Sequence, residues 1–294
     1  MTVKQFLLLL IPSALWGSSF IFMHHLSPVF GPILTSTIRI IVGALFLIVL
    51  FSIQKYKVYW KRDYKLFMLI GITNSAIPFS LYAYAALYIP SSLSVIINST
   101  SPMFGAVFAL ILLKDKLSTS KVVGVLLGTI GVGFVSSDIL AQHSTELYLS
   151  IIACTLAALL YGLNGAFVKM YAQHIEPKQL TVGSLTFAGI GMTVLVIILA
   201  LVGQFPKIVS ENIILDVFLI TSFGVLCTSI PYIIYYKLIK EVGPVKALTV
   251  TYLMPVFGLL WGIIFGEVIT GLMIIGLFII LLGIYILSHK KKEL

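Results

Sequence analysis

Charged positions in this chain are confined to short stretches between long apolar blocks. After Lys65, seven intervals of 16 residues or more contain no Asp, Glu, Lys or Arg, and most of them have the length of one bilayer crossing, about 20 residues. These intervals are residues 66–113, 122–137, 147–168, 179–206, 217–236, 247–266 and 268–289. Apolar blocks of this length and number predict an all-α protein that crosses a membrane many times.

Two of the apolar regions are too long to be single helices. The interval 66–113 would make one straight helix far longer than a bilayer at about 1.5 Å per residue, so it must fold back, and Pro90–Ser92 is the expected turn. Residues 5–52 divide in the same way at the polar, breaker-rich segment His24–Pro32. Ten membrane-spanning helices are therefore predicted, over residues 5–25, 32–52, 66–88, 91–113, 120–137, 147–169, 179–202, 214–236, 245–265 and 270–288.

Composition and charge agree with this pattern and indicate an orientation. The chain is 60% hydrophobic and 10% charged, with a mean hydropathy of +1.11, which is far from the composition of a soluble domain. With the N-terminus inside, 17 of the 19 Lys and Arg residues fall in cytoplasmic segments, leaving Lys207 outside and Arg39 within a span. The net charge of +9 therefore reflects the positive-inside rule, with both termini cytoplasmic, and not a nucleic-acid partner.

The second half of the sequence resembles the first half. Residue pairs match in order at offsets of 145, 153 and 152: Trp16-Gly17 with Tyr161-Gly162, Pro78 with Pro231, Tyr82 with Tyr235, Pro102 with Pro255, Asp115 with Glu267, Gly124 with Gly276 and Gly131 with Gly283. Because five helices is an odd number, the second copy must enter the membrane in the opposite orientation, an arrangement that recurs in transporters. We expect a first repeat at 1–138, a short outer linker at 139–146, a second repeat at 147–288 and a basic cytoplasmic tail at 289–294.

The repeated motifs resemble those of a known family. Each half has an aromatic-glycine pair in its first helix, a proline in its fourth helix and an acidic residue after that helix, here Trp16-Gly17, Ser101-Pro102, Met254-Pro255, Asp115 and Glu267. In these features the chain resembles the drug/metabolite transporter superfamily, specifically its EamA-type exporters. The resemblance implies a multi-pass carrier of the bacterial inner membrane that exports a small metabolite by alternating access. Two departures are Asp115, where Glu is commoner, and Tyr161, where Trp is commoner.

Arg39 is the charged side chain that these spans place inside the hydrocarbon region. A charge at this depth is costly and usually faces a cavity or a partner. One interpretation is that its guanidinium attracts a carboxylate-bearing substrate, such as an amino acid or an organic acid. The alternative is that Arg39 reaches the outer interface or pairs with a backbone carbonyl.

Other polar and aromatic residues fall near the same depth. The predicted substrate-binding residues are Trp16, Arg39, Asn74, Tyr82, Asn98, Tyr161, Asn164 and Tyr252. For the asparagines, interhelical hydrogen bonding is the alternative, and for the aromatic residues it is packing. The predicted hinges are Pro78, Pro102, Pro231 and Pro255, each of which removes a backbone donor, although such prolines also make static kinks.

The acidic residues favour facilitated export or exchange over proton antiport, because all ten are expected in connections or at helix ends. An integral-membrane enzyme acting on a lipid-like substrate would need clustered catalytic or metal-binding residues, and a membrane sensor would need a sizeable soluble domain; the sequence shows neither. We therefore expect no enzymatic activity, cofactor or metal. The expected partners are a small-molecule substrate and the lipid bilayer, and the oligomeric state stays open, with a monomer compatible.

Overall fold

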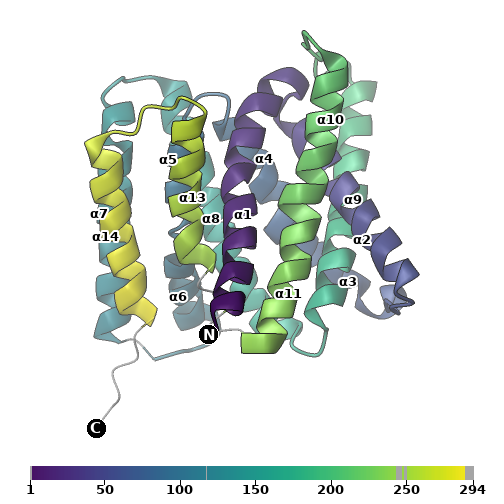
Figure 1. Ribbon diagram of the computed structural model, residues 1–294, viewed down its shortest axis with the longest axis horizontal. Helices are drawn as coiled ribbons and strands as arrows, with labels where there is room; N and C mark the ends of the chain where they lie inside the picture. Colours follow the sequence, from purple (N-terminus) through teal and green to yellow (C-terminus); the bar gives the residue numbers. More distant parts are fainter. Residues whose placement is uncertain (1, 117, 243–246, 248–249, 289–294) are drawn as a thin grey trace.

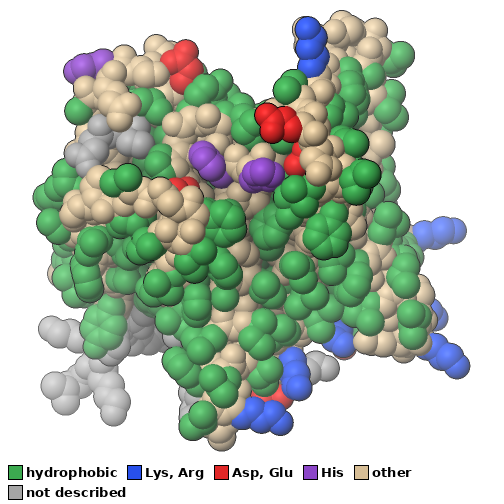
Figure 2. Space-filling model, turned by 45° about the horizontal axis from the view of Figure 1, so that its top comes forward, with side chains coloured by type: hydrophobic (Ala, Val, Ile, Leu, Met, Phe, Trp, Pro, Cys, Tyr) green, Lys and Arg blue, Asp and Glu red, His purple; other side chains and the backbone are tan. Residues whose placement is uncertain are grey.

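The computed structural model describes residues 2–116, 118–242, 247 and 250–288, and all regular elements in these ranges are helical. Eight helical stretches are long and apolar enough to cross a membrane, and Val250–Ile264 and Gly271–Leu287 are shorter apolar helices. The helices stand side by side with their axes roughly parallel (Figure 1). Hydrophobic side chains cover the middle of the surface in Figure 2, and charged side chains gather at its two rims. The chain is thus a multi-pass membrane protein.

The elements follow one another along the chain without intervening strands in the described residues. They are α1 (Val3–Phe30), α2 (Pro32–Ile53), α3 (Trp60–Gly71), η1 (Ile72–Ala76), α4 (Ile77–Ala85), α5 (Ser91–Asn98), α6 (Ser101–Leu112), α7 (Thr119–Leu140), α8 (Thr145–Tyr171), α9 (Pro177–Leu201), α10 (Ile213–Gly224), η2 (Val225–Ser229), α11 (Ile230–Val242), α13 (Val250–Ile264) and α14 (Gly271–Ser288). The segments η1 and η2 are single π-helical turns.

Two predicted boundaries are wrong, for related reasons. The connection expected at His24–Pro32 is a single residue, because α1 continues to Phe30 and the chain turns at Gly31, whose φ of +77° suits a residue without a side chain. The helix expected from residue 66 begins at Trp60. Polar and charged side chains near a membrane surface can extend into water while the backbone stays helical, so they do not mark where a helix ends.

The helix predicted over 91–113 is interrupted at its middle. The helix α5 ends at Asn98 and α6 begins at Ser101, with Pro102 in the first turn of α6. Ser99 and Thr100 are buried between them, and their hydroxyls donate to the carbonyl oxygens of Ile96 and Ile97. The backbone N–H groups of Ser99 and Thr100 bond to the same two carbonyl oxygens, at 3.1 Å each, so both carbonyl groups at the break are satisfied within the chain.

A π-helical turn precedes the proline in two corresponding places. The segment η1 ends two residues before Pro78, and η2 ends two residues before Pro231. A proline lacks the N–H that continues the α-helical ladder, and a wider turn on its N-terminal side relieves the mismatch. These turns therefore change the direction of the side chains that follow them, close to the middle of the membrane-spanning stretches.

Glycines allow the closest helix crossings. A Cβ atom on Gly283 of α14 would lie 2.8 Å from the carbonyl oxygen of Gly124 on α7, and one on Gly276 would lie 2.7 Å from that of Gly131. A Cβ atom on Gly17 of α1 would lie 3.0 Å from the backbone nitrogen of Gly258 on α13. Small residues of this kind let backbones approach each other, which is the main source of helix association in a bilayer.

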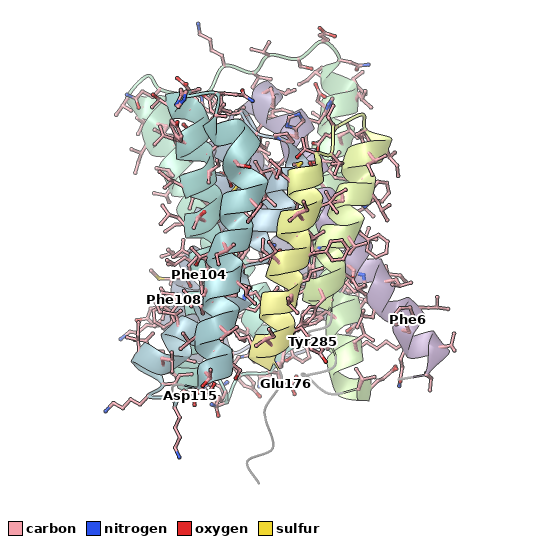
Figure 3. All side chains as sticks on the ribbon, turned by 90° about the vertical axis from the view of Figure 1, so that its left-hand side faces the viewer. Phe6, Phe104, Phe108, Asp115, Glu176 and Tyr285 are labelled. Atoms are coloured by element: carbon pink, nitrogen blue, oxygen red, sulfur yellow. The ribbon has the colours of Figure 1, made fainter. Side chains whose placement is uncertain are left out.

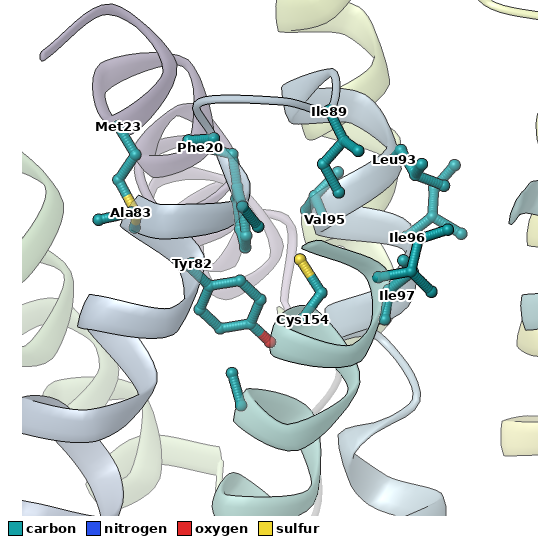
Figure 4. Close-up of a cluster of buried hydrophobic side chains, with 14 of the residues drawn as sticks. Phe20, Met23, Tyr82, Ala83, Ile89, Leu93, Val95, Ile96, Ile97 and Cys154 are labelled. Atoms are coloured by element: carbon teal, nitrogen blue, oxygen red, sulfur yellow. The ribbon is translucent and has the colours of Figure 1, made fainter. Parts of the chain in front are cut away.

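The largest buried cluster joins residues of several helices. It includes residues of α1, α4, α5 and α8, and Figure 4 shows Phe20, Tyr82, Ile96 and Cys154 within it. One end of the molecule carries Asp115 and Glu176, which lie close to one another in the view of Figure 3. The predicted tail 289–294 and Lys246 are outside the described residues.

Candidate functional site

Arg39 lies in the second turn of α2 and is only 4% exposed. Its Nε donates to Thr228 Oγ1 at 3.0 Å, and one terminal nitrogen lies 3.4 Å from both Ser19 Oγ and the carbonyl oxygen of Cys227. Two phenyl rings enclose the guanidinium plane: its Cζ is 3.7 Å from the ring centre of Phe79 and 4.4 Å from that of Phe223. Residues from α1, α2, α4, α10 and η2 thus hold one cation.

The second terminal nitrogen of Arg39, Nη1, is buried and has no hydrogen-bond partner among the described residues. No described carboxylate forms an ion pair with Arg39 either. An unpaired N–H on a charged group costs about 1–3 kcal/mol or more when it is buried. Flanking rings and neutral oxygens offset part of the cost of burying this charge. The contact with the carbonyl oxygen of Cys227 is the backbone pairing that the alternative interpretation expected, whereas the burial of the side chain does not fit an arginine that reaches the outer interface.

A second polar cluster lies where η1 meets α8. Asn164 Nδ2 donates to Asn74 Oδ1 at 2.9 Å, and Thr73 Oγ1 lies 3.3 Å from Asn164 Oδ1. Asn74 Nδ2 is 3.5 Å from the hydroxyl of Tyr232 on α11. The predicted alternative for Asn74 and Asn164, interhelical hydrogen bonding, is therefore present in the structure. Both residues are half-buried.

Aromatic rings line the region between these two clusters. Trp16 meets Tyr232 and Tyr235 edge to face, at ring separations of 5.4 and 5.5 Å. On the other side, Tyr82 and Tyr161 lie 6.1 Å apart, and the Tyr82 hydroxyl donates to Asn98 Oδ1 at 2.7 Å. Tyr82 is only 1% exposed and belongs to the largest buried cluster, whereas Trp16, Tyr161 and Tyr232 are half-buried.

The two clusters belong to one region of the molecule. Tyr161 and Tyr232 are both close enough to Arg39 to interact with it electrostatically, and Tyr232 also meets the amide of Asn74. Trp16, Tyr161 and Tyr232 are half-buried although they lie far from the ends of their helical stretches. We define the central polar site as Trp16, Arg39, Asn74, Tyr82, Asn98, Tyr161, Asn164 and Tyr232.

Tyr252 lies apart from the other predicted binding residues. Its hydroxyl lies 3.4 Å from the carbonyl oxygen of Ile284, so it joins α13 to α14. The predicted hinges lie at distinct places: Pro78 and Pro231 follow the π-helical turns, Pro102 is in the first turn of α6, and Pro255 is inside α13. Their movement stays a prediction.

The sequence missed five residues that complete the site. They are Ser19, Phe79, Phe223, Thr228 and Tyr232. The signal for Tyr232 was its position next to Pro231, one helical turn before the recognised Tyr235. The serine, threonine and phenylalanines carried no signal, because such residues are common throughout membrane helices.

The acidic side chains lie near helix ends, as expected. Asp63 accepts two hydrogen bonds from Arg62 and lies 3.7 Å from His174, and Asp216 lies 3.5 Å from His25. The Glu267 carboxylate accepts from the backbone N–H groups of Ser91 and Ser92 at 2.7 and 2.9 Å. No group of three or more His, Cys, Asp or Glu side chains suited to a metal ion occurs within the described ranges.

Comparison with known proteins agrees with the multi-pass helical fold, because two of the relatives described below are named transporters. An uncharacterized transporter of Archaeoglobus fulgidus is 25% identical over 98% of this chain and 100% of its own length. YoaV of Bacillus subtilis, also an uncharacterized transporter, is 21% identical over 96% of both chains, and PagO of Salmonella typhimurium is 23% identical over 95% of this chain and 91% of its own.

A solved crystal structure superposes with a TM-score of 0.66 over 99% of each chain, at 14% identity, which shows a likeness of fold alone. The resemblance seen in the repeated motifs is confirmed by a match to the EamA-like transporter family over residues 3–137 and 148–289. The chain therefore belongs to the EamA-like transporter family, and it is a multi-pass membrane transporter.

Proposed function

We propose that this transporter carries a small carboxylate-bearing metabolite, an amino acid or a related compound, out of the cell across the cytoplasmic membrane. The observation that carries the proposal is Arg39: a buried guanidinium with an unpartnered Nη1 and no carboxylate partner among the described residues. A substrate carboxylate would supply the missing counter-charge and a second pair of hydrogen bonds. The outward direction follows from the resemblance to EamA-type exporters.

The rest of the central polar site suits the remaining parts of such a substrate. The amide oxygens of Asn74 and Asn164 and the ring faces of Trp16 and Tyr232 are able to receive an ammonium or another donor group. Tyr82 and Tyr161 add apolar surface on the other side. A compound with a carboxylate at one end and a donor group nearby meets both kinds of residue.

Alternating access by two inverted five-helix halves is the proposed mechanism, with ten spans and both termini in the cytoplasm. The proposed repeat is supported by helix contacts that recur between the matching residues of the two halves. Gly17 on α1 packs against Gly258, and Gly162 on α8 packs against Gly105 in the same manner. At the crossing of α7 and α14, Gly124 packs against Gly283 and Gly131 packs against Gly276. At the offset of 152, Gly124 corresponds to Gly276 and Gly131 corresponds to Gly283, so each contact corresponds to the other. Such a pair of similar halves can exchange inward-open and outward-open arrangements around a fixed site.

Counterflow in proteoliposomes tests the substrate class. Labelled amino acids and nucleobases are compared with the amines that lack the carboxylate, for the wild type, Arg39→Lys, Arg39→Gln and the surface control Lys207→Gln. We expect saturable exchange of carboxylate-bearing compounds only. In Arg39→Gln, kcat/KM should fall by roughly 10- to 150-fold, the equivalent of losing one charged hydrogen bond of about 1.5–3 kcal/mol. Arg39→Lys should retain part of the activity, and Lys207→Gln should retain all of it.

Two results would count against this proposal. If folded Arg39→Gln exchanges amino acids with wild-type kinetics, Arg39 has a structural role and the substrate class loses its support. If the wild type exchanges the amines as well as the amino acids, recognition does not depend on a carboxylate. Size-exclusion profiles and melting temperatures of each variant separate these results from a loss of folding.

A further inference from the structure

A groove on the lipid-facing surface combines apolar walls with a basic lip. It has a volume of about 300 Å³ and lies between α3 and α9, lined by Trp60, Lys61 and Tyr64 of the first turns of α3 and by Phe187 of α9. The buried ring of Phe67 packs against two of these residues, with ring separations of 6.2 Å to Trp60 and 6.1 Å to Phe187. We call these residues the α3–α9 groove.

The charge around this groove is strongly positive. Lys55, Lys57, Lys61 and Lys65 are exposed, and none of them takes part in an ion pair in the part of the chain that the structure describes. The neighbouring carboxylate of Asp63 is buried, where Arg62 and Gln179 bond to it. Basic side chains also gather at the lower rim of Figure 2. Lys61 lines the groove beside its apolar walls, and this combination complements an anion that carries a hydrocarbon chain.

We propose that the α3–α9 groove is a binding site for an anionic phospholipid, with the phosphate at Lys61 and an acyl chain against Trp60, Tyr64 and Phe187. Clusters of four or more basic residues at the end of membrane helices attract anionic headgroups, and each contributes to binding near the surface. Tyrosine and tryptophan at this level favour the boundary between headgroups and chains. In the proposed orientation, this is the cytoplasmic leaflet.

A second groove, which has no charged lining residue, provides a comparison for the role of Lys61 in selecting an anionic headgroup. It has a volume of about 330 Å³ and lies between α2 and α9, with Ile41, Leu45 and Ile190 among its walls. Ordinary lipid chains of any headgroup suit that surface. The α3–α9 groove differs because it pairs its chain-binding walls with a phosphate-binding group. Since α3 and α9 come from different halves of the sequence, a lipid held there would also join the two halves.

Fluorescence quenching by brominated lipids tests this site directly and requires no transport activity. The chain has three tryptophans, so the double substitution Trp16→Phe/Trp261→Phe leaves Trp60 as the single reporter, inside the groove. Brominated phosphatidylglycerol and brominated phosphatidylcholine are titrated separately into protein reconstituted in unlabelled phosphatidylcholine. We expect phosphatidylglycerol to bind about fivefold more tightly, the effect of one lysine near a membrane surface. Lys61→Gln should lower that preference, because Lys61 is the lysine that lines the groove, and Lys114→Gln, at the end of α6, should keep it.

Phe187→Ala provides a second variant that leaves the charge in place. It should weaken quenching by both lipids while the preference for phosphatidylglycerol remains. Equal quenching of Trp60 by the two lipids in the wild type would overturn the proposal, because the groove would then hold ordinary boundary lipid. Displacement of brominated phosphatidylglycerol by millimolar inorganic phosphate would also overturn it, because the site would then bind a free anion rather than a lipid. Melting temperatures confirm that each variant is folded.

Discussion

Glu267 caps a helix that belongs to the other half of the sequence, and its loss should be measurable as a loss of stability. Its two carboxylate oxygens accept from the backbone N–H groups of Ser91 and Ser92, at the start of α5. Burial of the carboxylate opposes its ionisation, but these hydrogen bonds outweigh that cost and hold the pKa of Glu267 below its usual value. The favourable interaction therefore needs the ionised form.

The substitution Glu267→Gln keeps the size of the side chain and removes the charge. An amide has one acceptor oxygen, so one of the two N–H groups at the start of α5 loses its partner and faces an NH₂ group. Leaving that donor unsatisfied costs about 1–3 kcal/mol. Losing a negative charge at the N-terminus of a helix costs a further 0.3–1 kcal/mol or so. A total of about 2 kcal/mol corresponds to a melting temperature lower by roughly 4–8 °C.

Intrinsic tryptophan fluorescence reports unfolding in this protein at acid and neutral pH alike, because the chain has three tryptophans. Melting curves in detergent are compared for the wild type, Glu267→Gln and Glu211→Gln, whose glutamate is exposed in a connection. A depressed pKa stabilises the fold above the unfolded pKa and loses that effect as the pH falls through the folded pKa. The difference between wild type and Glu267→Gln should thus be constant between about pH 6 and 8 and shrink below about pH 4.5. Equal melting at neutral pH, or a difference that persists in acid, would refute the cap.

Two further predictions concern packing and the central polar site. Gly283→Ala should lower stability by about 1–3 kcal/mol, because the new Cβ would lie 2.8 Å from a backbone oxygen of α7, whereas Gly191→Ala, with open space around it, should be neutral or stabilising in the same melting assay. Tyr82→Phe should cost about 1–3 kcal/mol, because Asn98 loses its 2.7 Å hydrogen bond, and Tyr64→Phe on the exposed surface should change stability by less than about 0.5 kcal/mol. Unchanged melting of either Gly283→Ala or Tyr82→Phe would contradict the corresponding contact.

Much of the fold could be predicted from the sequence because a bilayer imposes a simple rule. A spanning helix must be apolar over about 20 residues, so the charge-free intervals locate the helices. The same rule does not reveal the π-helical turns before Pro78 and Pro231 or the break between α5 and α6. These features depend on how neighbouring helices satisfy the freed backbone groups, which is a tertiary property.

The sequence predicted those site residues whose side chains are most costly to bury in a membrane, and it missed those that are inexpensive to bury. Arg39 and the amides of Asn74 and Asn164 stand out because a charge or an amide inside a membrane needs a partner. Thr228 did not stand out, because a hydroxyl is commonly satisfied by the carbonyl oxygen one turn earlier in its own helix. Phe79 was missed as well, since nothing in the sequence distinguishes a ring over a guanidinium from a ring that faces lipid.

The proposed alignment of the two halves allows residues of the central polar site to be compared at equivalent positions. Shared positions include the glycines of the helix crossings and the prolines after the π-helical turns, which are features of the framework. Within the site the halves differ. Arg39 corresponds to Ser184 at the offset of 145, and Asn164 corresponds to Ser19, which bonds to Arg39.

Under this alignment the framework residues are similar in both halves, whereas the residues at equivalent points of the site differ, with one cationic cluster and one amide-rich cluster. Two equivalent clusters would suit a ligand with two equivalent ends. One cationic and one neutral acceptor cluster instead favour a substrate with a single carboxylate and a separate donor group, held in one orientation. This asymmetry favours an amino acid over a symmetric dicarboxylate, because the second carboxylate would face amide oxygens without a counter-charge.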